Sequence, residues 1–136
     1  MVSQAAGRLY TRPVPAKTPR KTAAKTAERL CVFALSFPEA TDAHPWGETA
    51  IKVKGKTFLF MRAGEDGISL SVKLRNSRDY ALDWPSCEPT HYGLGSKGWV
   101  SAKFGPKDKP PVGLLEGWIE ESYRAFAPKK LVASVK

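Results

Sequence analysis

Apolar and polar residues alternate through the middle of the chain. Lys52 separates Ile51 from Val53, and every second residue of 68–74 is apolar. A period of two places the apolar side chains of a strand on one face and the polar ones on the other. The pattern therefore predicts strands over 48–54, 57–62 and 67–74, joined as a meander, and a fourth strand over 99–104.

Helical periodicity replaces this alternation toward both ends of the sequence. Apolar residues recur at helical spacing over 27–37, which predicts a first helix that begins at Thr22 and ends at Pro38. Further helices are predicted over 112–127, after Pro128 and, as a short segment, over 76–81.

This order of elements predicts an α+β fold. We expect an antiparallel sheet of four to five strands with the N- and C-terminal helices packed on one face. The remaining segments, 39–47 and 82–98, are predicted to be loops. The face of the sheet without helices is then expected to carry Lys52, Lys54, Lys73 and Arg75.

The composition fits one globular domain. With 136 residues, 42% of them hydrophobic and 26% charged, the chain is long enough to bury a single core. The net charge of +9 is concentrated at the N-terminus, where residues 1–29 hold seven Lys and Arg against Glu28. Residues 1–21 are therefore predicted to be a basic flexible arm, and residues 22–136 a single domain.

A basic arm attracts polyanions, of which nucleic acid is the commonest in a cell. Two other interpretations stay open: a tail that only increases solubility, or a targeting peptide, since residues 1–27 contain no acidic side chain. The sequence has no run of 18 apolar residues, so it predicts a soluble, cytoplasmic protein without a membrane partner.

The sequence offers little for catalysis or for metal binding. Cys31 and Cys87 are isolated, and no histidine lies at ligand spacing from either. The glycine pattern at 93–98 leads into a strand, which is the wrong context for a dinucleotide-binding loop. Only His44 and His91 could act as general bases, and no motif places a carboxylate beside them. We therefore expect no enzyme, no metal site and no cofactor.

Four short motifs occur in a fixed order along the chain. They are Pro45-Trp46-Gly47-Glu48, the lysine-rich hairpin at 52–58, His91-Tyr92 followed by Gly98-Trp99-Val100, and Glu121-Ser122-Tyr123-Arg124. Together they resemble the MmcQ/YjbR family of small bacterial proteins, from about Leu30 to Val135. The resemblance implies a compact α+β domain that binds DNA and is of the double-wing type. The basic extension before Thr22 and the segment 81–88 depart from the family pattern and leave the partner open.

The first functional hypothesis is a nucleic-acid-binding module. Its wings are the hairpin around Gly55 and the unit around Lys97-Gly98-Trp99. Seven basic side chains are predicted to contact phosphates: Lys52, Lys54, Lys56, Lys73, Arg75, Lys97 and Lys103. The lysines of the first helix lie near the arm, and the last helix is acidic, so neither resembles a base-reading helix. Binding is therefore expected to be weakly sequence-selective, with DNA preferred to RNA.

The second hypothesis is a protein-interaction or chaperone-like adaptor, or a module for a small acidic ligand. Its groove is lined by Trp46, Tyr92 and Trp99, with His91 beside them. Aromatic side chains in such places either cap the sheet or stack on a ligand. The charge outside the first 29 residues is only +3, which favours this hypothesis over strong nucleic-acid binding. Similarity of fold does not decide between the two.

Overall fold

The computed structural model describes residues 17–43, 48–91 and 93–135, with side chains from Ala23 onward. The helices are α1 (Lys17–Leu35), α2 (Arg78–Leu82), the 3-10 helix η2 (Gly95–Lys97), α3 (Val112–Phe126) and α4 (Lys129–Ala133). The strands are β1 (Ala40–Ala43), β2 (Thr49–Val53), β3 (Lys56–Gly64), β4 (Gly67–Lys73), β5 (Cys87–Pro89) and β6 (Trp99–Phe104).

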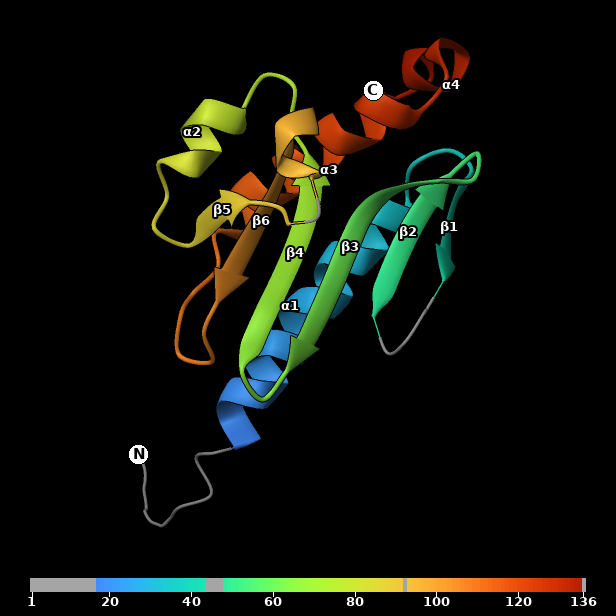
Figure 1. The fold of residues 1–136 in the computed structure, drawn as a ribbon. Coiled ribbons are helices and arrows are strands. Elements are labelled where there is room, and N and C mark those ends of the chain that lie inside the picture. The colour runs from blue at the N-terminus through green and yellow to red at the C-terminus, as the bar shows by residue number, and fades with distance from the viewer. Residues whose placement is uncertain (1–16, 44–47, 92, 136) are drawn as a thin grey trace.

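The strands form one antiparallel sheet in the order β1-β2-β3-β4-β6-β5. α1 passes behind β3 and β4 in Figure 1, and both α1 and α3 contact these two central strands. α2 contacts β5 and β6, and its Ala81 is part of the same buried core. The predicted α+β architecture, with the terminal helices on one face of an antiparallel sheet, is confirmed.

The sheet has six strands in the described residues, where the sequence predicts four to five. The two additional strands, β1 and β5, are the edge strands, and both lie in segments predicted to be loops. β1 is four residues long and β5 three, and neither alternates between apolar and polar residues. β1 and β5 are strands because they pair with β2 and β6, and the local sequence does not indicate this pairing.

The first helix begins at Lys17, five residues before the predicted start at Thr22. The prediction relied on apolar periodicity, and residues 17–22 contain no large apolar side chain. A helix can nevertheless include them, because Pro19 falls in the first turn, where a missing amide hydrogen has no consequence.

The β2–β3 hairpin contains a two-residue turn and a bulge. Lys54 and Gly55 both have positive φ, 51° and 78°, as a type I′ turn requires. Ile51 pairs with Leu59, but Lys52 pairs with Thr57, so Phe58 is an extra residue in β3. The bulge lets the consecutive residues Phe58 and Leu59 both be fully buried.

The buried hydroxyl of Ser122 on α3 lies where β3 bulges. Its Oγ donates a hydrogen bond to the Phe58 carbonyl oxygen at 2.6 Å and accepts one from the Lys73 amide at 3.0 Å. These two backbone groups belong to β3 and β4. One side chain therefore joins α3 to both central strands at the bulge.

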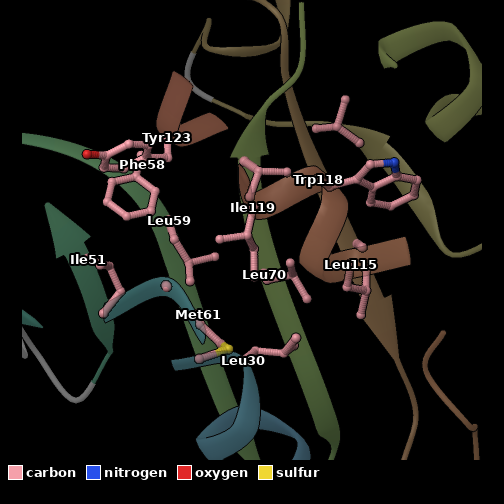
Figure 2. Close-up of a cluster of buried hydrophobic side chains, with 14 of the residues drawn as sticks. Leu30, Ile51, Phe58, Leu59, Met61, Leu70, Leu115, Trp118, Ile119 and Tyr123 are labelled. Carbon is pink, nitrogen blue, oxygen red and sulfur yellow. The ribbon is translucent and has the colours of Figure 1, made fainter. Parts of the chain in front are cut away.

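Aromatic rings close the core next to this bridge. The Tyr123 ring stacks on Phe37 at 4.7 Å between centroids and meets Phe58 edge-on at 5.3 Å. The Tyr123 hydroxyl donates to the Pro38 carbonyl oxygen at 2.8 Å, which satisfies the polar end of a fully buried ring. Figure 2 shows the aliphatic part of the same core, with Leu59 and Leu70 of the sheet near Ile119 of α3.

We expect Ser122→Ala to lower the free energy of unfolding by about 2–4 kcal/mol, because two largely buried backbone groups are left without a hydrogen-bond partner. Urea unfolding followed by circular dichroism measures this change. The matched control is Ser134→Ala, which removes one exposed hydroxyl bonded to the Leu131 carbonyl oxygen and should cost no more than about 0.5 kcal/mol. Equal effects of the two substitutions would contradict the bridging role of Ser122.

Candidate functional site

The face of the sheet turned away from α1 and α3 is defined by the strand register, and we call it the open face. Phe60, Ser71 and Ser101 are cross-strand partners on this face, as are Arg62, Ser69 and Lys103. Lys73 pairs with Trp99, and Lys52 lies between the buried Ile51 and Val53, so these side chains are also on the open face.

Four basic side chains lie on the open face: Lys52, Arg62, Lys73 and Lys103. Lys52 and Lys73 are separated by β3, and Arg62 and Lys103 by β4, so each pair of Cα atoms is about 10 Å apart. Lys52 and Lys73 form one row, and Arg62 and Lys103 form another. The two rows are four residues apart along β4, which is about 13 Å. The face therefore presents positive charge at four separate points, two in each row.

These four basic side chains differ in their contacts with neighbouring side chains. Lys103 Nζ lies 3.4 Å from Glu88 Oε2, and Lys73 Nζ lies 5.3 Å from the centroid of the Phe126 ring. Neither Lys52 nor Arg62 has an ion-pair partner in the part of the chain that the structure describes. Lys52 and Arg62 are therefore the cations with least competition for an incoming anion.

Sequence reasoning identified three of these residues and missed Arg62. Arg62 follows the run Thr57-Phe58-Leu59-Phe60-Met61, in which the bulge interrupts the alternation. Unless the bulge is known, alternation through that run does not show on which face of the sheet Arg62 lies. The signal in the sequence was its position two residues after Phe60, because residues two apart lie on the same face of a strand. In the structure, Phe60 is only partly buried.

The structure places Lys54 and Arg75 off the open face, contrary to the prediction. Lys54 occupies the β2–β3 turn, and its Nζ lies 2.7 Å from Glu39 Oε1. Arg75 follows the end of β4 and donates from its guanidinium to the Ala125 carbonyl oxygen at 3.1 Å. The alternation of Lys52 with Lys54 ends at the turn, so it could not be extended to the second lysine. Lys56 and Lys97 are exposed at the start of β3 and on η2.

The aromatic groove of the second hypothesis is only partly within the described residues. Trp99 is 6% exposed, and its ring lies 5.7 Å from that of Phe60 and 5.8 Å from that of Phe126. Trp99 therefore packs against neighbouring rings and leaves little exposed surface on which a ligand could stack. His91 is exposed, with Nε2 3.7 Å from Glu88 Oε2. Trp46 and Tyr92 lie outside the described residues.

Hydroxyl groups occupy the centre of the open face. Ser71 Oγ lies 2.7 Å from Ser101 Oγ, which in turn lies 2.9 Å from Thr90 Oγ1. Three hydroxyls joined by two hydrogen bonds have one proton left to donate outward. Hydroxyls between cations suit phosphate oxygens, which are hydrogen-bond acceptors.

A hollow of about 610 Å³ lies at one end of the open face. Arg62, Ser69 and Lys103 line it from three strands, and the β3–β4 turn lines it from the other side. Gly67, the first residue of β4, has φ of 112°, and a Cβ there would collide with the Phe104 carbonyl oxygen. Only glycine therefore allows β4 to start this close to the end of β6.

The described residues offer neither a metal centre nor a membrane-spanning helix. No group of three or more His, Cys, Asp or Glu side chains there is arranged to hold a metal ion. No helix among them is long and apolar enough to cross a bilayer. The arrangement on the open face is instead suited to binding a multiply charged anion.

The carboxylate of Glu121 on α3 accepts hydrogen bonds from the turn that follows β4. Glu121 Oε2 accepts hydrogen bonds from the amides of Asn76 and Ser77 at 2.8 and 3.0 Å, and Oε1 accepts one from the Ser77 hydroxyl at 2.8 Å. Partial burial by itself raises the pKa of Glu121, but the hydrogen bonds from Ser77, Asn76 and the Arg75 amide outweigh it and lower the pKa.

The chain belongs to the YjbR family, whose model matches residues 35–125. The match contains all of β1 to β6 and all but the last residue of α3. The predicted family is therefore confirmed, and the open face lies within the matched region.

A solved structure supports the same fold. The crystal structure of the Deinococcus radiodurans protein DR2400, described as a DUF419 domain, is similar with a TM-score of 0.59 at 22% sequence identity. The similarity covers 71% of this chain and 75% of that one. No curated protein matches the chain.

We expect the pH dependence of stability to identify the Glu121 contacts. Because the pKa of Glu121 is lowered in the folded state, its contribution is present above the unfolded pKa of about 4.3 and is lost as the pH falls through the folded pKa. Glu121→Gln should therefore make the loss of stability below about pH 5 less steep. Thermal unfolding from pH 7 to pH 3 measures it.

The control for this experiment is Glu120→Gln, one position earlier on α3. Among the described residues Glu120 pairs with Arg124 alone, at 2.9 Å, on an exposed helix face. If the two variants have the same acid profile, the contacts of Glu121 with the turn are not the cause.

Proposed function

We propose that this protein binds nucleic acid through the sugar–phosphate backbone, on the open face, and that it does so without catalysis. The observation that carries the proposal is the placement of Lys52, Arg62, Lys73 and Lys103 on the one sheet face that α1 and α3 leave uncovered. Membership in the YjbR family is consistent with this proposal.

Contacts of this kind position a nucleic acid without reading its sequence. Base reading in the major groove requires an inserted helix or β-ribbon, and α1 and α3 lie on the opposite face of the sheet. Stacking of unpaired bases requires exposed aromatic rings; among the described residues, Trp99 of the open face is buried between Phe60 and Phe126, and the exposed Tyr80 lies on α2. Duplex DNA, recognised with little sequence preference, is therefore the partner that we propose.

α1 begins at Lys17, so residues 17–21 of the predicted basic arm are helical. Residues 1–16 contain only Arg8 and Arg12 as basic side chains. The five other basic residues before Leu30 are on α1. The arm can therefore contribute at most a small share of the phosphate contacts.

We expect replacement of Lys52, Arg62, Lys73 and Lys103 by Gln to reduce the slope of log K against log salt on duplex DNA by about 0.9 for each phosphate that the protein no longer neutralises. The effect should be the same for different sequences. Fluorescence anisotropy with two unrelated duplexes between 50 and 200 mM salt, a range of about fourfold, measures it.

The matched control replaces four exposed lysines elsewhere: Lys25, Lys107, Lys109 and Lys130. It makes the same change in net charge. An identical decrease in slope for the control would mean that net charge, and not the open face, determines binding.

Deleting residues 1–16 should leave most of the binding intact. The deletion removes two arginines and keeps the whole of α1, so the salt slope should decrease by no more than about 1.8. The same anisotropy titration measures this. Loss of all salt-sensitive binding would show that the arm, and not the sheet, carries the interaction.

A further inference from the structure

We propose that the hollow at the end of the open face binds the terminal phosphate of a nucleic-acid strand, so that the protein prefers phosphorylated ends. This inference rests on the proposed function and adds a ligand to one part of the same face. It concerns Arg62, Ser69 and Lys103, which line the hollow together with the β3–β4 turn.

The three side chains form a row across three adjacent strands. Arg62 of β3 pairs with Ser69 of β4, and Ser69 pairs with Lys103 of β6. Cross-strand partners project from the same face, so a guanidinium, a hydroxyl and an ammonium group face the hollow side by side. Neither Arg62 nor the Ser69 side chain has a polar partner within the described residues, so both remain able to bind a ligand.

These groups match a phosphate monoester better than an internal diester. A monoester carries between one and two negative charges near neutral pH and has three terminal oxygens. The planar fork of Arg62 can bind two oxygens, and the Ser69 hydroxyl can donate to another. An internal phosphate offers only one charge and two unesterified oxygens to the same row.

Acidic side chains at the far side of the hollow favour binding of the end of a strand over binding of its middle. Glu65 and Asp66 lie on the β3–β4 turn, directly beyond the basic row, and both line the hollow. A strand that crosses the open face from Lys52 and Lys73 meets this row and then the two carboxylates. Continuing past them would bring further phosphates against like charge, which is unfavourable. Ending in the hollow avoids that repulsion.

The test compares one 20-base-pair duplex in three forms, with 5′-phosphate, 3′-phosphate or hydroxyl at its ends, by fluorescence anisotropy with the full chain. We expect one or both phosphorylated forms to bind about five- to tenfold more tightly than the hydroxyl form, a range typical of one added charge-assisted contact. The two phosphorylated arms identify which end is preferred.

Two variants locate the effect in the hollow. Ser69→Ala and Arg62→Gln should each remove most of the difference between phosphate and hydroxyl ends, whereas Lys130→Gln, an exposed charge outside the hollow, should keep it.

The outcomes separate this inference from the proposed function. Equal affinity for all three duplexes overturns the end preference while salt-dependent binding to the open face still stands. Persistence of the preference in both Ser69→Ala and Arg62→Gln overturns the assignment to the hollow. Absence of binding to every duplex overturns the proposed function and this inference with it.

Discussion

The hydrogen bonds of Ser122 are the interaction on which the arrangement of the sheet depends. The bulge at Phe58 interrupts the ladder between β2 and β3, and the paired part of β3 and β4 ends at Phe60 and Ser71, so the Phe58 carbonyl and the Lys73 amide lie beyond it; a buried backbone group without a partner is strongly unfavourable. Ser122 supplies both partners at once, a donor for the Phe58 carbonyl and an acceptor for the Lys73 amide. Because Ser122 belongs to α3, the same contact fixes where that helix crosses the sheet. The neighbouring Tyr123 then enters the core between Phe37 and Phe58.

The open face is a consequence of this packing. The bulge restores the register so that Lys52 projects outward while Phe58 and Leu59 both reach the core. The apolar area of the sheet is covered by α1 and α3, so the opposite face can carry charge without a cost of burial. Trp99 and Phe60 fill part of that face with rings, which supports the lysine and arginine stems that lie around them.

The central strands and the long C-terminal helix could be predicted because each buries one face, which leaves a periodic trace in the sequence. β6 was predicted with its observed bounds for this reason. β1 and β5 leave no such trace, because an edge strand of three or four residues is defined by its neighbour. Lys52 and Lys73 were assigned correctly to the open face by alternation, but Lys54 was not, since a turn ends the period. Arg62 required knowledge of the bulge, which only the pairing of β2 with β3 reveals.

The net charge of the domain is a poor guide to what this face can bind, because three of the acidic side chains lie on α3, away from it. Glu116, Glu120 and Glu121 are all on α3, on the covered side of the sheet. Arg29 and Arg124 pair with two of them, at 3.6 and 2.9 Å, which keeps those contacts within the helical layer. On the other side, Lys52 and Arg62 have no such neighbours in the described chain. An approaching polyanion therefore meets positive charge on the open face that no ion pair within the described chain neutralises at Lys52 and Arg62, so a modest total charge still allows attraction to this face.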